Sequence, residues 1–285
     1  MGKDITAKLD KCLPKTEGRL FHIYDAMRYS ALSGGKRIRP ILMSLAYEAV
    51  GGKGENIDPF LCAIEMIHTY SLIHDDLPAM DDDDFRRGME TNHIKFTEWT
   101  AILAGDALLN RAFEVMLEAT VKTPKPSYIE AMHTLSIASG TRGMIGGQVI
   151  DIMSENEDVH EDTVDFIHRN KTAALMVAPV DMGAILGGAT EKEKEALHKF
   201  AFNIGMAFQI ADDILDVLST QEDLGKPINS DIEKNKATYV SIHGVEKAKK
   251  QVEDLTTQGI RELAILGVKG EKLKQIALFL TSRKY

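Results

Sequence analysis

Residues 209–216 read Gln209-Ile210-Ala211-Asp212-Asp213-Ile214-Leu215-Asp216, and this stretch decides how the rest of the chain is interpreted. Asp212 and Asp216 are four residues apart, so a helix places their carboxylates on one face, about 40° from eclipsed. The residues around them are apolar, which disfavours a solvated acidic surface. Like charges at this spacing repel each other and destabilise the helix unless a cation neutralises them. We therefore expect a helix that presents a cation site.

A second acidic cluster lies earlier, at Asp75-Asp76-Leu77-Pro78-Ala79-Met80-Asp81. Pro78 lacks a backbone donor and crowds the preceding turn, so the helix that carries Asp75 is expected to end or bulge there. On an ideal helix Asp81 would point about 120° away from Asp75, whereas a bulge brings both to one cation. Neither cluster has a nearby cysteine. Hard oxygen ligands of this kind favour Mg2+, which bridges to phosphates.

The composition indicates an acidic globular protein. Of the 285 residues, 44% are hydrophobic and 27% are charged, and no run approaches the ~18 apolar residues of a membrane span. The formal net charge of -9 argues against nucleic acid as a partner. The first residues lack the apolar run of a secretory signal, so we expect a cytoplasmic protein without stable membrane insertion. Gly2 and Thr6 fit the loose myristoylation pattern, which chance or a cloning remnant explains better.

Helical periodicity runs through almost the whole chain with little sustained period-2 alternation, so we predict an all-α fold in a single domain, residues 1–285. Glycines 140, 143, 146 and 147 fall inside one predicted helix. They indicate either close helix packing or a ligand pressed against the backbone. The predicted helices cover residues 3–12, 19–33, 38–51, 57–80, 95–121, 127–153, 160–187, 191–220, 232–258 and 270–283.

Basic residues flank the first acidic cluster. Arg86-Arg87 follow it, and Gly34-Gly35-Lys36-Arg37-Ile38-Arg39-Pro40 precede it. Guanidinium groups suit diphosphate oxygens because each can donate two parallel hydrogen bonds. Glycines just before a helix also leave backbone N-H groups open to an anion. Taken alone, each basic group fits an ordinary solvated surface equally well.

An ordered set of motifs spans nearly the whole chain. In sequence order these motifs are Gly34 to Pro40, His68, Asp75 to Asp81, Arg86-Arg87, Lys171-Thr172, Gln209 with Asp212 to Asp216, Lys226 and Lys236. Together they resemble the trans-isoprenyl diphosphate synthases. The stretch Ile67-His68-Thr69-Tyr70-Ser71-Leu72-Ile73-His74 is most similar to the bacterial farnesyl diphosphate synthases of that family. No motif position departs from the pattern.

The resemblance implies an isoprenoid synthase-type bundle of mostly antiparallel helices around a deep central cavity, commonly assembled as a homodimer. The two aspartate clusters would face each other across the cavity mouth. The implied reaction is Mg2+-dependent head-to-tail prenyl transfer: an allylic diphosphate ionises, isopentenyl diphosphate attacks the cation and a proton is lost. The expected substrates are isopentenyl diphosphate with dimethylallyl and geranyl diphosphate, and the expected product is (E,E)-farnesyl diphosphate.

The resemblance also assigns a role to each motif residue. About three Mg2+ ions would be held by Asp75, Asp81 and Asp212, with Asp76, Asp213 and Asp216 supporting them directly or through water. The allylic diphosphate would be bound by Arg86, Lys171, Lys226 and Lys236. The isopentenyl diphosphate would be bound by Lys36, Arg39, His68 and Arg87. The expected catalytic residues are Lys171, Thr172 and Gln209, the last two with oxygen dipoles that stabilise positive charge at the allylic carbon.

Product length depends on two residues before the first aspartate. Tyr70 and Ser71, the fifth and fourth residues before Asp75, are expected to form the floor that stops the growing chain. An aromatic residue at the fifth position is the farnesyl-type pattern of the family. On an ideal helix Tyr70 points about 140° away from Asp75, so simple core packing is the alternative role.

Three alternative functions fit parts of the sequence. A geranylgeranyl diphosphate synthase would use the same motifs with a deeper cavity. A class I terpene cyclase needs only the metal-bound diphosphate site, so the second, basic set of residues favours the transferase. A non-catalytic partner subunit would not need both aspartate clusters. The two intact clusters and the basic set together favour the prenyltransferase.

Overall fold

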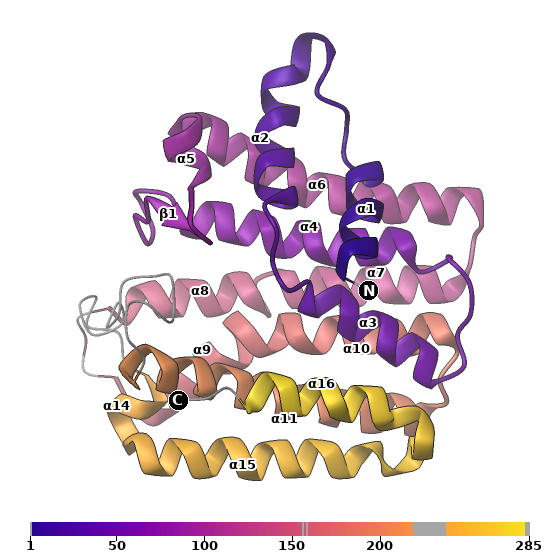
Figure 1. Cartoon of the computed structure of the whole chain (residues 1–285), viewed down its shortest axis with the longest axis vertical. Coiled ribbons are helices and arrows are strands. Elements are labelled where there is room, and N and C mark those ends of the chain that lie inside the picture. Colours follow the sequence, from indigo (N-terminus) through magenta and orange to yellow (C-terminus); the bar gives the residue numbers. More distant parts are fainter. Residues whose placement is uncertain (1, 156, 158, 219–237, 283–285) are drawn as a thin grey trace. The chain divides into compact units, whose positions relative to one another are not determined.

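The computed structural model describes residues 2–155, 157, 159–218 and 238–282, and these residues are almost entirely helical (Figure 1). The all-α prediction is confirmed. Within this part of the chain, β-structure is limited to a hairpin of β1 (Phe85–Arg86) and β2 (Met89–Glu90). None of the described helices is long and apolar enough to cross a membrane.

The chain divides into two compact units. The first comprises Met1–Ser44 and Gly54–Met132, and the second comprises Leu45–Lys53 and His133–Tyr285. Two helices, α3 (Ile38–Ala49) and α7 (Pro126–Ser139), contribute residues to both units. The single domain expected over residues 1–285 stays a prediction.

The first unit is built around α4 (Asp58–Asp75), which runs alongside α6 (Glu98–Lys122) in Figure 1. Every residue of α4 from Phe60 to Ile67 is buried, including Glu65. The two helices approach closely at Gly105, where an added Cβ would lie 2.1 Å from Nε2 of His74. The other helices of this unit are α1 (Gly2–Cys12), η1 (Gly18–Leu20), α2 (Phe21–Leu32) and α5 (Asn92–Lys95).

The helix predicted over residues 57–80 ends at Asp75, so the prediction is wrong for its last five residues. Pro78 explains the early end, because it cannot continue the helical hydrogen bonding. The following turn leads back: the backbone N-H of Asp81 donates to the carbonyl of Asp75 at 2.8 Å. Asp82 then takes a positive φ of 54°. The helix end and turn therefore bring the backbones of Asp75 and Asp81 together.

The second unit is built around α11 (Glu191–Leu218). One face of α11 packs Ile210 and Ile214 against Val240 and Val252, and each such buried aliphatic side chain stabilises the fold by about 1.5–3 kcal/mol. Asp213 of the second acidic cluster also lies on the side of α11 that meets α14, because its Oδ2 accepts from the backbone N-H of Tyr239. The other elements here are α8 (Met144–Met153), α9 (Glu161–Ile167), η2 (His168–Ala173), α10 (Ala174–Gly187), α14 (Tyr239–His243), α15 (Val245–Glu262), η3 (Leu263–Gly270) and α16 (Glu271–Thr281).

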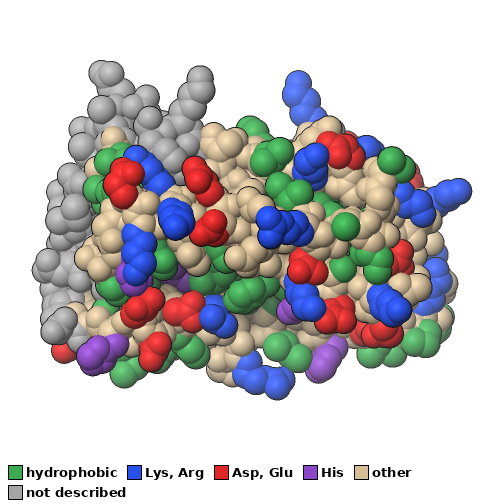
Figure 2. Space-filling view, turned by 90° about the horizontal axis from the view of Figure 1, so that it is seen from below, with side chains coloured by type: hydrophobic (Ala, Val, Ile, Leu, Met, Phe, Trp, Pro, Cys, Tyr) green, Lys and Arg blue, Asp and Glu red, His purple; other side chains and the backbone are tan. Residues whose placement is uncertain are grey.

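Helix α15 packs along α11 and carries the outward face of this unit. Its buried residues, Ala248, Val252, Thr256 and Gly259, recur every three to four positions, so they form one stripe on the helix. Viewed from below in Figure 2, basic and acidic side chains intermix on this face, and neither sign forms a continuous patch. The face has no visible preference for an anionic partner.

Two other predicted helices are interrupted in the structure. The prediction of one helix over residues 127–153 is wrong, because α7 ends at Ser139 and α8 begins at Met144. At the break an added Cβ on Gly143 would lie 2.2 Å from the carbonyl oxygen of Ala138. The predicted helix 160–187 contains the π-helical turn η2, and residues 232–237 of the helix predicted over 232–258 lie outside the described residues.

The π-turn is held tightly by two glycines. An added Cβ on Gly147 of α8 would lie 2.2 Å from the backbone nitrogen of Lys171. An added Cβ on Gly205 of α11 would lie 3.1 Å from Cα of Ala173. Gly147 therefore serves close packing, one of the two interpretations of the glycine cluster. A π-turn often marks a functional site, and this one contains Lys171 and Thr172.

We predict that Gly147→Ala lowers the free energy of unfolding by about 1–3 kcal/mol, because the new methyl group must displace the backbone at Lys171. Urea unfolding followed by circular dichroism measures the change. Val149→Ala is the matched control, since Val149 is 49% exposed on the same helix. An equal loss of stability in both variants would show that the approach at Gly147 is not tight.

Candidate active site

The first acidic cluster combines carboxylates with different surroundings. Asp76 is 3% exposed, and its Oδ1 accepts from Nε of Arg86 at 2.7 Å while Nη2 of Arg86 lies 2.6 Å away. Burial opposes the charge on Arg86, but the hydrogen bond and charge of Asp76 outweigh it and raise the pKa of Arg86. Arg86, expected to bind the allylic diphosphate, is therefore engaged with Asp76. Asp75 and Asp81 are only partly buried on the same turn.

A buried ion pair organises the loop before α3. Arg37 has a φ of 52° and is 3% exposed, and its Nη1 donates to Oε1 of Glu65 at 2.5 Å. Its Nη2 donates to the carbonyl of Ala31 at 2.8 Å. Sequence reasoning missed both members of this pair. A lone carboxylate within the apolar stretch Phe60–Ile67 was the available signal, because a buried charge needs a partner.

Basic side chains surround His68 on α4. Loss of water lowers the pKa of His68 well below 6.5, and the positive charges of Arg39, Arg87, Arg86 and Arg37 act in the same direction. The imidazole is therefore neutral at physiological pH. The structure thus brings together Arg39, His68 and Arg87, three of the four residues expected to hold isopentenyl diphosphate.

Arg87 is fixed against the glycine-rich loop. Its Nη1 donates to the carbonyl of Gly34 at 2.7 Å. An added Cβ on Gly35 would lie 2.6 Å from the same nitrogen, and Gly35 has a φ of 110°. A side chain at position 35 would displace the guanidinium as well as strain the backbone. The fourth expected residue, Lys36, is exposed on this loop.

The two expected chain-length residues differ in their contacts. Tyr70 is 4% exposed, its ring lies edge-on to His74 with centroids 5.8 Å apart, and its hydroxyl has no hydrogen-bond partner among the described residues. Burial and then the charge of Asp75 raise the pKa of Tyr70 to about 12. The Ser71 hydroxyl donates to the carbonyl of His68 at 2.9 Å, within its own helix.

The second unit carries the other expected site residues on η2 and α11. Lys171 forms an ion pair with Asp151 of α8. The Thr172 hydroxyl donates to Oε1 of Gln209 at 2.6 Å, so these two expected catalytic residues lie together. Asp151 was missed by sequence reasoning, although it follows the glycine cluster that touches the backbone of Lys171. Lys226 and Lys236 lie outside the described residues.

Asp213 is the buried member of the second acidic cluster, with 3% exposure. Its Oδ1 accepts from Nε2 of Gln209 at 2.9 Å, and its Oδ2 accepts from the backbone N-H of Tyr239 at 2.9 Å. Nε2 of His168 lies 3.3 Å from Oδ2. Asp212 and Asp216, on the same helix, are partly buried. Sequence reasoning missed His168, whose position three residues before Lys171 was the available signal.

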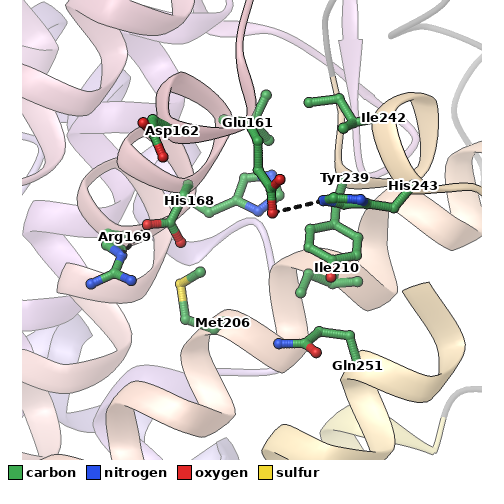
Figure 3. A pocket seen from close by; sticks show the side chains of 12 residues that line it. Glu161, Asp162, His168, Arg169, Met206, Ile210, Tyr239, Ile242, His243 and Gln251 are labelled. Carbon is green, nitrogen blue, oxygen red and sulfur yellow. Dashed lines mark hydrogen bonds and ion pairs between the residues drawn. The ribbon is translucent and has the colours of Figure 1, made fainter. Parts of the chain in front are cut away.

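A pocket of about 280 Å³ borders the partners of Asp213 (Figure 3). His168 reaches it from η2, Tyr239 and His243 from α14, and Glu161 from α9. Nε2 of His243 lies 3.0 Å from Oε1 of Glu161. The motifs of the sequence did not indicate this pocket.

The acidic residues fit Mg2+ by their chemistry. Asp75 with Asp81, and Asp212 with Asp216, provide oxygen ligands in pairs. Among the residues with described side chains, no group of three or more His, Cys, Asp or Glu could hold a metal by itself. Mg2+ accepts such incomplete sets, because it keeps waters and completes its coordination with phosphate oxygens.

Comparisons with known proteins identify the family. Residues 21–264 match the Polyprenyl synthetase family model. A geranylgeranyl diphosphate synthase of Cyanophora paradoxa is 48% identical over 276 residues, which cover 96% of this chain and 91% of the relative. The chloroplastic heterodimeric geranylgeranyl pyrophosphate synthase large subunit 1 of Arabidopsis thaliana is 46% identical over 275 residues, covering 94% and 73%.

The fold comparison agrees with the sequence comparison. The crystal structure of an FPP/GFPP synthase from Zymomonas mobilis matches with a TM-score of 0.87 at 37% identity, covering 98% of this chain and 95% of that one. The motif order, the helical fold and these relatives all point to one family. The chain therefore belongs to the polyprenyl synthetases, the trans-isoprenyl diphosphate synthases, and is a prenyltransferase.

Proposed function

We propose that this prenyltransferase joins isopentenyl diphosphate head-to-tail to dimethylallyl and then geranyl diphosphate, with (E,E)-farnesyl diphosphate as its main product. The observation that carries the proposal is the group of arginines around His68, which adds Arg37, Arg39 and Arg87 to the Arg86 that pairs with Asp76. Two diphosphates require two kinds of site, one with metal and one basic. A terpene cyclase requires only the metal site.

The acidic clusters are proposed to bind Mg2+ through Asp75, Asp81 and Asp212, with Asp76, Asp213 and Asp216 in support. When bound, Mg2+ neutralises the charge that develops on the leaving diphosphate. The supporting role of Asp76 and Asp213 fits their burial and their hydrogen bonds to protein donors. These donors hold the aspartate backbone in place around the proposed ligands.

The allylic substrate is proposed to lie beside Lys171, Thr172 and Gln209, with Arg86, Lys226 and Lys236 also on its diphosphate. Asp151 holds the Lys171 ammonium, which fixes a positive charge next to Thr172. As the allylic C-O bond breaks, the oxygens of Thr172 and Gln209 stabilise the carbocation. The double bond of isopentenyl diphosphate then forms the new C-C bond, and the departing diphosphate takes the proton that is lost.

Isopentenyl diphosphate is proposed to bind to Lys36, Arg39, His68 and Arg87. Because His68 is neutral, it contributes a hydrogen bond rather than charge. The guanidinium groups supply the charge, and Arg87 is positioned for this by the Gly34 carbonyl. No metal is needed at a site where fixed cations already neutralise the diphosphate.

Tyr70 supports the C15 product. Its ring lies edge-on to His74, the residue next to Asp75 on α4. The ring is buried and rigidly packed beside His74, as a floor for the growing chain requires. Geranylgeranyl diphosphate is the second candidate product, favoured by the named activities of the Cyanophora and Arabidopsis relatives.

A homodimer is proposed as the working assembly. Helix α6 exposes Trp99, Ile102 and Leu103 by 58%, 44% and 49% within one turn and a half, a grouping that supports an interface. The cytoplasmic location expected from the first residues stays a prediction, and the Arabidopsis relative is a chloroplast protein.

We predict strict metal dependence. EDTA should abolish turnover and Mg2+ should restore it, and Asp75→Ala should lower kcat by about 1,000-fold, because several kcal/mol of charge stabilisation are lost at ~1.4 kcal/mol per decade. A radiometric assay with labelled isopentenyl diphosphate measures the rates. Asp84→Ala is the control, an exposed aspartate of the following loop. A near-normal kcat for Asp75→Ala would contradict the metal-site assignment.

We predict that Lys36→Ala and Arg39→Ala each raise the KM for isopentenyl diphosphate by about 10-fold or more, since each removes one charge-assisted contact to it. Lys171→Ala should instead lower kcat and act on the allylic substrate. Slow hydrolysis of geranyl diphosphate alone, which reports ionisation, should survive the Lys36 change. Equal effects of the three variants on both substrates would mean that the two diphosphate sites are misassigned.

We predict that wild-type protein stops at C15 and that Tyr70→Ala yields C20 or longer products, because removing the ring opens space along α4. Chromatographic sizing of the dephosphorylated products gives the answer. Tyr70→Phe keeps the ring and should keep C15. A wild-type C20 product supports the second candidate, and a folded Tyr70→Ala variant that still stops at C15 assigns Tyr70 to core packing.

A further inference from the structure

The carboxylate of Asp213 accepts hydrogen bonds from α11 and α14, and an imidazole from η2 lies beside it. Gln209 on α11 donates to Oδ1, and the backbone N-H of Tyr239 on α14 donates to Oδ2. His168 on η2 lies 3.3 Å from Oδ2 through its Nε2 (Figure 3 shows His168 and Tyr239). A carboxylate can only accept hydrogen bonds, so every group around it must present hydrogen. This requirement fixes the orientation of its neighbours.

Asp213 orients the Gln209 side-chain amide, and that amide in turn orients the Thr172 hydroxyl. The Gln209 side chain must turn its NH2 group to Asp213, which leaves its oxygen facing the Thr172 hydroxyl. The Thr172 hydroxyl has one hydrogen, and it donates that hydrogen to Oε1 of Gln209 at 2.6 Å. To any third group, Thr172 can therefore offer only oxygen lone pairs. Lone pairs stabilise a cation, whereas a hydroxyl hydrogen would repel it.

We propose that Asp213 is a positioning residue that sets the direction of the Thr172 hydroxyl through the Gln209 amide, and that Tyr239 and His168 hold it in this role. The inference rests on the proposed function, in which Thr172 and Gln209 face the allylic carbocation. It adds that Asp213 acts on the reaction through hydrogen-bond direction. Its contribution to kcat is then separable from metal binding.

The variant Asp213→Asn tests whether Asp213 sets the direction of the Thr172 hydroxyl. The Tyr239 N-H belongs to the backbone and cannot turn, so the new side chain must keep its oxygen towards Tyr239 and His168. Its NH2 group then faces Gln209, the Gln209 amide rotates, and Thr172 becomes an acceptor with its hydrogen released towards the substrate. We expect kcat to fall by about 100-fold, the usual effect of one misdirected polar group at a developing charge, with little change in either KM.

The matched variant exchanges the two side-chain types. Adding Gln209→Glu to Asp213→Asn preserves the net charge and the shape of both side chains. The carboxylate at position 209 accepts from the amide at 213 and from Thr172, so the hydroxyl direction is restored. We expect the double variant to exceed Asp213→Asn in kcat by about 10-fold, a strong departure from additivity of the two single variants. A double variant as slow as Asp213→Asn would overturn the proposal.

Two further measurements keep the test decisive. The Mg2+ concentration for half-maximal activity should be the same in Asp213→Asn and in the double variant, because neither has a carboxylate at position 213. A fall in the double variant that matches its gain in kcat would attribute that gain to metal binding and overturn the proposal. Thr172→Val should lose kcat as much as Asp213→Asn does, while Thr172→Ser should keep it, which tests the hydroxyl even if Asp213→Asn does not fold. Full activity of Thr172→Val overturns the proposal. Absence of prenyl transfer by wild type would instead refute the proposed function.

Discussion

Repulsion between neighbouring carboxylates is the constraint on which both acidic clusters depend. In each cluster the second aspartate is buried and bonded to other parts of the protein. Asp76 and Asp213 are both 3% exposed, and both accept hydrogen bonds from other elements. The compensation differs, since a guanidinium neutralises Asp76 whereas an amide, a backbone N-H and an imidazole surround Asp213. The two buried aspartates are therefore held by different kinds of donor.

Helix α4 has acidic and basic surroundings at different positions along one side. Glu65, His68 and Asp75 are separated by three and seven residues, so they lie within about 80° of one another around the helix. Glu65 is paired with Arg37, burial and the surrounding arginines lower the pKa of His68, and Asp75 ends the helix. The proposed sites for an anion and for a cation therefore lie at different positions along one helix. Removing either member of the Arg37–Glu65 pair would leave a buried charge, at a cost of about 3–5 kcal/mol.

The parts of this molecule that repeat with the helical period could be predicted from sequence. The all-α fold followed from periodicity, and the end of α4 near Pro78 followed from the chemistry of proline. The partners of buried charges could not be predicted, because Glu65 meets Arg37 and Asp213 meets Tyr239 only through tertiary packing. The π-turn was equally hidden, since α10 after it is buried at nearly every position and its hydrophobic pattern therefore does not reveal a shift of one residue. The expected roles of Lys226 and Lys236 fall outside the described residues.

The number of residues in the π-turn His168–Ala173 determines which of its side chains reach α11. Deleting one residue there would convert the turn to ordinary α-helix and rotate one flanking helix by about 100° relative to the other. His168 and Thr172, which now both reach partners on α11, would then no longer face it together. Most surface loops tolerate insertions and deletions, whereas a length change here would break the contacts of His168 and Thr172 with α11. Divergence of related enzymes is therefore restricted here to substitutions, and a length change within these six residues would mark a homologue that has lost this chemistry.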